Sequence, residues 1–95
     1  MNLAQIRNIP IDKRIFYVPE NAQYLYWKIY NEKKIISKNQ CREFAFSGDM
    51  KEADFIEAFS TLIDMKLIVE TNGAVRTHML QESEDNNQQK MFGDD

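Results

Sequence analysis

Residues 62–80 read LIDMKLIVETNGAVRTHML, and this stretch decides the fold of the chain. Two short runs rich in β-branched residues, 67–71 and 74–80, flank the dipeptide Asn72-Gly73. Asn and Gly both tolerate positive φ, which a two-residue type I′ turn requires at its two central positions. We therefore expect the two runs to form a β-hairpin closed by Asn72 and Gly73.

Two helices and a strand are expected in the first half of the chain. Residues 14–18 are β-branched and aromatic and are closed by Pro19, so they predict a strand or extended arm. Apolar residues then recur at helical spacing over residues 22–34. A second, shorter helix is predicted over residues 37–45, with Ser37 as its N-cap.

The third helix is the best-defined element of the sequence. Asp49 opens it as a capping box with Glu52 three residues later, and the helical pattern continues to Lys66. Its buried stripe is expected to consist of Phe55, Ile56, Phe59, Leu62 and Ile63. Truncation of Phe59 should therefore destabilise the domain strongly.

The order strand, helix, helix, turn, helix, hairpin resembles that of the winged helix-turn-helix family. The resemblance spans residues 13–80, and the passage from Leu62 to Glu70 looks like that family's junction between third helix and wing. Where many members have Gly at the end of the helix, this chain has Lys66. The resemblance implies an α+β fold with three helices, a β-hairpin wing and a short N-terminal strand. Winged-helix domains act as DNA readers and as protein adaptors.

The chain is expected to form one small domain with an arm and a tail. Its 95 residues include 43% hydrophobic side chains, enough for a single modest core. Residues 1–12 are expected to be an N-terminal arm, extended before Pro10, and residues 13–80 the winged-helix domain. Residues 81–95 are acidic and begin with a stretch free of apolar side chains, which predicts a disordered tail.

The sequence contains no signal for a membrane span, a secretory leader or an enzyme site. A cytoplasmic protein is therefore expected. The single cysteine, Cys41, excludes an internal disulfide and is expected to be a buried thiol. The single histidine, His78, has no second His or thiolate cluster with which to form a zinc site. With three glycines and no nucleophile–base pair or phosphate-binding loop, the chain is predicted to be a non-enzymatic binding protein without cofactors.

Charge is distributed unevenly along the chain. Residues 1–48 carry eight Lys or Arg against four Asp or Glu, whereas residues 49–80 carry three against six. The start of the third helix presents the carboxylates of Asp49, Glu52, Asp54 and Glu57. Because these would meet two rows of phosphates in a DNA groove, major-groove reading is disfavoured. The alternatives are an ordinary solvated face and a face that contacts a basic protein surface.

A second candidate surface combines cations with aromatic rings, a pairing typical of proteins that bind single-stranded nucleic acid. Tyr24, Trp27 and Lys28 fall on the side of the first helix opposite its core-facing residues. This side packs against the N-terminal arm, forms a homodimer contact, or binds nucleic acid or a partner protein, and we predict that Trp27 marks a functional surface. The other candidate residues are Lys33, Lys34, Lys38, Arg42 and Arg76.

The tail contains a short linear motif. The pentapeptide Gln88-Gln89-Lys90-Met91-Phe92 places two large apolar residues in a polar segment. It resembles the motif by which bacterial replication and repair proteins dock on the DNA polymerase sliding clamp. In that motif a glutamine makes polar contacts and the last two residues fill a pocket, roles that fall here to Gln88, Met91 and Phe92, with Met where leucine is commoner. A disordered terminus without a specific partner is the alternative.

These features lead to three hypotheses. The leading one is a winged-helix adaptor of DNA replication or repair, encoded by a phage or plasmid, that binds the bacterial sliding clamp or another replication protein through its tail. The second is a winged-helix regulator that binds single- or double-stranded DNA with the basic side of its first helix and the wing. The third is an inhibitor of a host nucleic-acid enzyme whose acidic helix and tail imitate phosphates.

Overall fold

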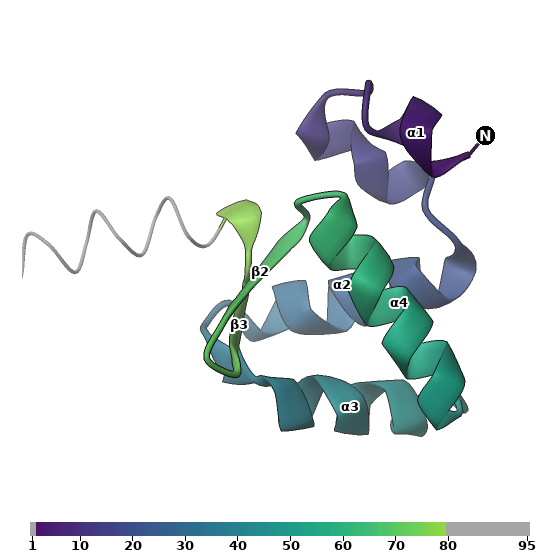
Figure 1. Cartoon of the computed structure of the whole chain (residues 1–95). Coiled ribbons are helices and arrows are strands. Elements are labelled where there is room, and N and C mark those ends of the chain that lie inside the picture. Colours follow the sequence, from purple (N-terminus) through teal and green to yellow (C-terminus); the bar gives the residue numbers. More distant parts are fainter. Residues whose placement is uncertain (1, 80–95) are drawn as a thin grey trace, which may run out of the picture.

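The computed structural model describes residues 2–79, which form four α-helices, a 3-10 helix and a three-stranded sheet (Figure 1). In chain order the elements are α1 (Leu3–Ile6), η1 (Ile11–Phe16), α2 (Glu20–Glu32), β1 (Ile36–Ser37), α3 (Lys38–Ser47), α4 (Glu52–Asp64), β2 (Ile68–Thr71) and β3 (Ala74–Thr77). The predicted α+β class is thereby confirmed. The predicted tail, residues 81–95, lies outside the described residues.

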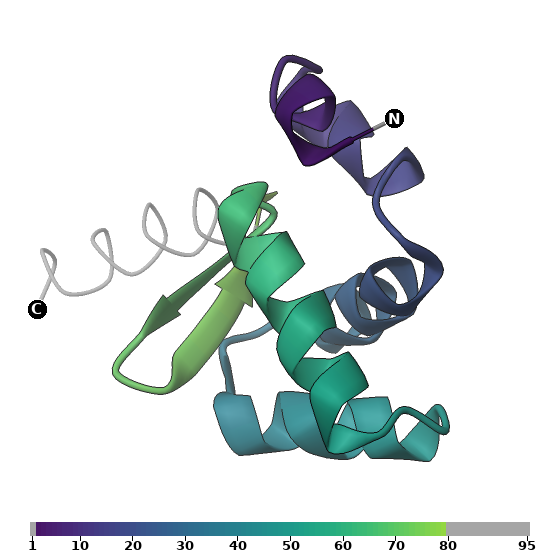
Figure 2. The same ribbon diagram turned by 45° about the vertical axis from the view of Figure 1, so that its right-hand side comes forward.

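The wing hairpin forms as the sequence predicts. Asn72 and Gly73 take φ values of 53° and 83°, the left-handed conformation that a type I′ turn needs. β2 pairs antiparallel with β3, and β1 pairs with the other edge of β3 through Ile36 opposite Val75. β3 is therefore the central strand, and Figure 2 shows the hairpin projecting beside α4.

The first strand of the sheet lies elsewhere than the sequence suggests. Residues 14–18, expected to be an N-terminal strand, belong to η1 and the turn after it, and the strand is β1, between α2 and α3. Ile15 and Val18 are both buried, at 4% and 3% exposure. Because these two residues are three apart, the segment buries its apolar side chains at helical spacing and not at the alternating spacing of a strand. The prediction of an N-terminal strand is wrong.

Helices α2, α3 and α4 pack on one another, and the sheet contacts α2 and α4. Ser37 caps α3 as predicted, since its Oγ accepts a hydrogen bond from the backbone N–H of Gln40 at 3.0 Å. The order α2, β1, α3, α4, β2, β3, with β3 between β1 and β2, fits a small winged-helix-like fold.

Helix α4 begins later than the sequence predicts. Asp49 has a φ of 67°, so it belongs to the turn after α3 and does not cap α4. The cap falls at Lys51, whose backbone N–H donates a hydrogen bond to Asp54 Oδ2 at 3.0 Å. Beyond the other end of the helix, Lys66 takes a φ of 64°, a left-handed conformation that favours Gly. Lys66 adopts this conformation although it is not a glycine, so the turn into the wing is kept.

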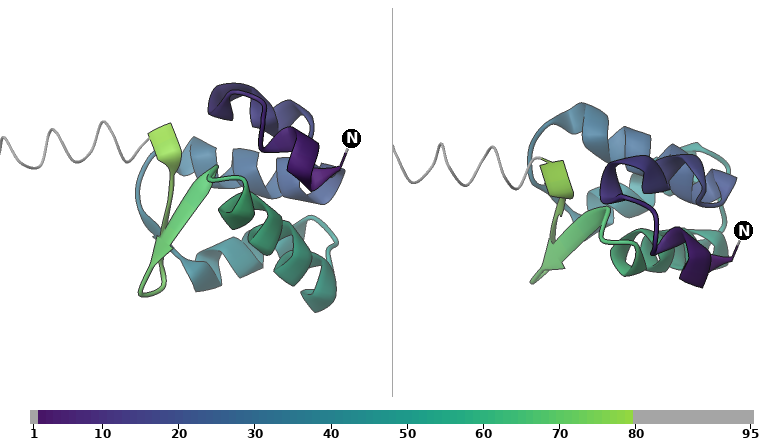
Figure 3. Two further views of the ribbon diagram at one scale, coloured as in Figure 1. Left: turned by 45° about the horizontal axis from the view of Figure 1, so that its top comes forward. Right: turned by 90° about the horizontal axis from the view of Figure 1, so that it is seen from above.

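The N-terminal residues fold onto the domain and do not form an extended arm. Asn2 caps α1, because its Oδ1 accepts a hydrogen bond from the backbone N–H of Gln5 at 2.9 Å. Ile6 is 1% exposed and belongs to the same buried cluster as residues of α2 and α4. Figure 3 shows the N-terminal segment lying over α2. The expectation of an extended chain before Pro10 is wrong, since one capped helical turn buries Ile6.

The core lies between the three long helices and the sheet. Phe55, Phe59 and Leu62 of α4 are buried, at 1%, 5% and 0% exposure, as the helical stripe predicts. Cys41 of α3 is also fully buried, which confirms the expected buried thiol. Among the helices of residues 2–79, none combines the length and the apolar character needed to cross a membrane.

Candidate functional site

The four predicted acidic residues at the start of α4 do not form one continuous face. Glu52 Oε2 lies 3.2 Å from Arg42 Nη2 of α3, so this carboxylate pairs within the fold. Asp54 accepts the backbone hydrogen bond at the start of α4. Asp49 lies in the preceding turn, and Glu57 is exposed one turn into the helix. Half of the acidic set is therefore engaged in local structure.

An exposed isoleucine lies on the outer side of α4. Ile56 is 53% exposed, although the sequence pattern predicts it in the core. The prediction is wrong because, within residues 2–79, no neighbouring element covers the side of α4 on which Ile56 lies. Ile56 lies one helical turn from both Glu52 and Ser60, so the three side chains form one row. Ile56 also lines a hollow with Lys38 and Arg42 of α3, so this side of α4 combines an exposed apolar side chain with an ion pair.

A shallow groove of about 580 Å³ runs along α4, and α1, α3 and β2 each contribute one residue to its lining. Its lining includes the carboxylates of Glu57, Asp64 and Glu70 and one ammonium group, that of Lys38. Asp64 is paired with Arg7 of the N-terminal segment. The two other carboxylates of the lining, Glu57 and Glu70, are opposed there by one cation, Lys38. The groove therefore favours cationic over anionic groups of a partner.

The predicted basic residues are divided between two surfaces, of which the first lies where α3 meets α4. Lys38 Nζ is 5.0 Å from the centre of the Phe59 ring. Arg42 Cζ is 5.6 Å from the centre of the Phe55 ring, and Arg42 also pairs with Glu52. Both cations lie over rings of α4 and hold α3 against it through cation–π contacts. This part of the predicted basic set supports packing.

The second surface is the exposed side of α2 and the turn that follows it. Trp27 is 41% exposed, and its ring meets that of Tyr30 edge to face at a centroid distance of 5.4 Å. Lys33 Nζ lies 5.5 Å from the centre of the Tyr30 ring. We call this surface the α2 aromatic face and define it by the residues Trp27, Lys28, Tyr30, Lys33 and Lys34.

Two predicted surface residues are placed differently by the fold. The Tyr24 ring rests on Gly48, where an added Cβ would lie 2.4 Å from Tyr24 Cε2. Tyr24 therefore packs α2 against the turn between α3 and α4. Arg76 is half-buried on β3, and its buried Nε has no hydrogen-bond partner among residues 2–79. Tyr24 is therefore engaged in packing, and both side chains are only partly exposed.

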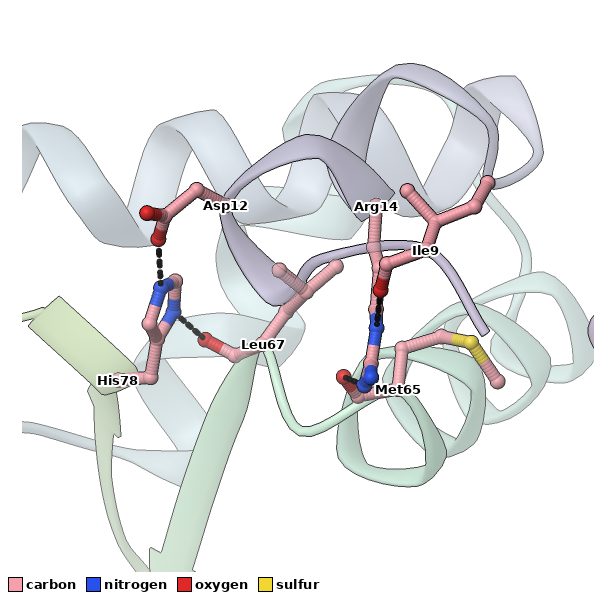
Figure 4. A network of polar contacts seen from close by, with 6 residues as sticks. All are labelled: Ile9, Asp12, Arg14, Met65, Leu67 and His78. Atoms are coloured by element: carbon pink, nitrogen blue, oxygen red, sulfur yellow. Dashed lines mark hydrogen bonds and ion pairs between the residues drawn. The ribbon is translucent and has the colours of Figure 1, made fainter. Parts of the chain in front are cut away.

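A set of polar contacts that the sequence did not reveal ties the N-terminal segment to the end of α4 (Figure 4). The Arg14 guanidinium donates hydrogen bonds to the backbone carbonyls of Met65 at 2.7 Å, Ile9 at 2.8 Å and Arg7 at 2.8 Å. The last carbonyls of a helix have no hydrogen-bond donor within the helix. Arg14 supplies a charged donor to the carbonyl of Met65, which directly follows α4. We call these three hydrogen bonds the arginine clasp.

His78 extends this contact from the end of β3. Its Nε2 lies 3.2 Å from Asp12 Oδ1, and its Nδ1 lies 3.3 Å from the carbonyl oxygen of Leu67 (Figure 4). The imidazole therefore joins η1 to the wing. Across residues 2–79, no group of three or more His, Cys, Asp and Glu side chains is arranged to hold a metal ion. The sequence around Arg14 gives no periodic signal for these contacts, since Met65 lies 51 positions away.

Burial changes the acidity of two core groups. Desolvation raises the pKa of the Cys41 thiol from 9.0 to about 12. Desolvation, with a smaller effect of Tyr30, raises the pKa of the Tyr26 phenol from 10.0 to about 12. Cys41 therefore stays protonated at neutral pH and lacks the thiolate that a nucleophile requires.

We expect the protein to lose stability in alkaline solution. In the unfolded chain Cys41 and Tyr26 ionise near 9.0 and 10.0, but the fold keeps them neutral up to a pKa of about 12. Burial of these neutral groups therefore contributes fully to the free energy of unfolding below pH 9. Above pH 9 the free energy of unfolding falls by up to about 1.4 kcal/mol per pH unit for each group. Urea unfolding over a series of pH values measures this loss. Cys41→Ala should delay its onset to near pH 10, and an unchanged profile would contradict the prediction.

Of the surfaces predicted from the sequence, two present exposed side chains within residues 2–79. They are the outer side of α4 with its groove, and the α2 aromatic face. Comparison of the chain with protein-family models, with curated proteins and with solved structures finds no match. The chemistry of these two surfaces and of the tail motif therefore carries the functional inference.

Proposed function

We propose that this chain is a non-enzymatic, cytoplasmic winged-helix adaptor of DNA replication or repair that binds partner proteins and does not read DNA with α4. The observation that carries the proposal is the outer side of α4, where Glu57 is exposed and Ile56 is 53% exposed. The corresponding helix of a groove-reading domain lies between two rows of phosphates. Here the exposed carboxylate of Glu57 would repel those phosphates, and Arg42 is already paired with Glu52, so little counterion release would stabilise a protein–DNA complex.

The same side of α4 suits a protein partner. A protein interface combines an apolar centre with a polar rim, and Ile56 has this relation to the charged side chains of Glu52, Arg42 and Lys38 around it. The neighbouring groove is lined by Glu57 and Glu70 and would accept a lysine or arginine of the partner. The adaptor thus contacts a basic protein surface through α4.

We assign docking on the replication machinery to the tail motif, whose residues Gln88, Met91 and Phe92 resemble a sliding-clamp ligand. The motif lies outside the described residues. Residues 80–87 separate it from the domain, and eight residues reach at most about 30 Å. A clamp bound to the motif would therefore be held close to the domain, together with whatever the domain binds.

Calorimetric titration of a purified bacterial sliding clamp with the full chain tests the docking proposal. We expect micromolar binding that is lost in Phe92→Ala, because the terminal apolar residue of such a motif fills a pocket and acts as its anchor. Gln89→Ala is the matched control and should bind as the parent does, since this position lies between the anchors. Equal binding by a chain lacking residues 88–95 would overturn the assignment.

A further inference from the structure

The α2 aromatic face exposes an aromatic ring that the fold holds in place. The Trp27 ring meets Tyr26 and Tyr30 at centroid distances of 5.1 Å and 5.4 Å, with interplanar angles of 80° and 87°. Tyr26 is buried and anchors this cluster to the core. Trp27 nevertheless remains 41% exposed. A large ring is therefore presented to solvent with little freedom left to lose on binding.

Three lysines lie on α2 and the turn that follows it, and two of them are close to tyrosine rings. Lys33 Nζ lies 5.5 Å from the centre of the Tyr30 ring, and Lys28 Nζ lies 5.7 Å from that of Tyr24. Lys33 also ends α2 with a left-handed φ of 56°, and the exposed Lys34 follows it. Within residues 2–79 none of the three lysines forms an ion pair, in contrast to Arg42. Their ammonium groups remain available to anions.

The charge of this region is positive but small. α2 also carries Glu20 and Glu32, so the three lysines of the face are opposed by two carboxylates. A rigid polyanion such as duplex DNA would gain little from this balance. A ligand that fits the face must therefore combine phosphates with a flat group able to stack on Trp27.

We propose that the α2 aromatic face binds single-stranded nucleic acid. Unpaired bases stack on an exposed aromatic ring while the phosphates between them contact lysines, and stacking of this kind is tolerant of sequence. A duplex keeps its bases stacked inside the helix and offers none to Trp27. This activity goes beyond the proposed clamp docking and does not depend on it.

The chain contains its own reporter for this site, since Trp27 is its single tryptophan. We expect unlabelled oligothymidylate to quench Trp27 fluorescence at low salt, whereas a duplex of the same length should not. The logarithm of the affinity should fall with that of the salt concentration with a slope of about −2, given about 0.7 per neutralised phosphate and three lysines. Absent quenching, or tighter binding of the duplex, would overturn the proposal.

Anisotropy of labelled oligothymidylate separates the contributions of the ring and the lysines. Trp27→Ala should weaken binding about 5- to 150-fold, the range expected for loss of one stacked base, and Trp27→Phe should recover part of it. Lys33→Glu with Lys34→Glu should also weaken binding and flatten the salt slope. Lys51→Glu, at the start of α4, is the matched control and should bind as the parent does.

Three further measurements exclude other causes. The unfolding midpoint of each variant shows whether reduced binding reflects unfolding; a folded Trp27→Ala with parental affinity would overturn the proposal. Trp27 fluorescence that changes when the protein alone is diluted would mark the face as a contact between two copies and would also overturn it. A chain lacking residues 88–95 should bind the oligonucleotide as the parent does. Failure of clamp docking is thus distinguishable from failure of nucleic-acid binding.

Discussion

Phe59→Ala is expected to lower the free energy of unfolding by about 3–5 kcal/mol. The Phe59 ring is 5% exposed, lies 5.5 Å from the Phe55 ring and is covered by Lys38 Nζ at 5.0 Å. Truncation leaves a cavity between α3 and α4 and removes the cation–π partner of Lys38. Urea denaturation monitored by circular dichroism measures the loss.

Two variants serve as controls for this prediction. Phe59→Leu keeps an apolar side chain in the cavity and should therefore recover much of the stability lost in Phe59→Ala. Trp27→Ala changes the exposed side of α2 and should leave the thermal midpoint within a few degrees of the parent. A loss in Trp27→Ala as large as that in Phe59→Ala would contradict the placement of Trp27 on a binding surface.

Arg14→Ala is expected to lower the free energy of unfolding by about 2–4 kcal/mol, because it removes the arginine clasp. The carbonyls of Arg7, Ile9 and Met65 would lose a charged donor at 2.7–2.8 Å. Since the clasp joins the N-terminal segment to the end of α4, hydrogen exchange of the backbone amide of Ile6 should also accelerate. Urea denaturation and amide exchange measure the two effects.

The geometry of the clasp predicts how related substitutions behave. Arg14→Lys keeps the charge, but one ammonium group lacks the planar fork that reaches three carbonyls, so it should recover less than half of the loss. Arg7→Ala removes an exposed ion pair with Asp64 and should cost less than about 1 kcal/mol. Equal costs for Arg7→Ala and Arg14→Ala would contradict the structural role of the clasp.

The binding surfaces were only partly predictable from the sequence. Trp27 was recognisable because helical spacing places it opposite the core residues of α2, and its exposure follows from that spacing. Lys38 and Arg42 were assigned to the same surface, but they lie over Phe59 and Phe55 of another helix. Spacing along one helix shows which side a residue is on and not which neighbouring element will cover it.

The sequence by itself determined the elements whose signals lie within a few residues. Asn72 and Gly73 specify the wing because both positions need positive φ, and Ser37 specifies the start of α3 because its hydroxyl accepts a backbone hydrogen bond three residues on. The burial of Phe55 and Phe59 follows in the same way from the helical period. In each case the energetic preference is local, so the rest of the chain does not have to be known.

Only the tertiary structure decided the features that depend on distant partners. β1 is two residues long and exists because β3 offers it an edge through Val75. Ile56 is exposed because no neighbouring element covers that side of α4 within residues 2–79, although its residue type favours the core. Arg14 reaches Met65 across 51 positions of the chain, and a contact of that range leaves no periodic trace in the sequence around either residue. Local preference cannot encode such pairings, because they become favourable only once the helices have brought the two groups together.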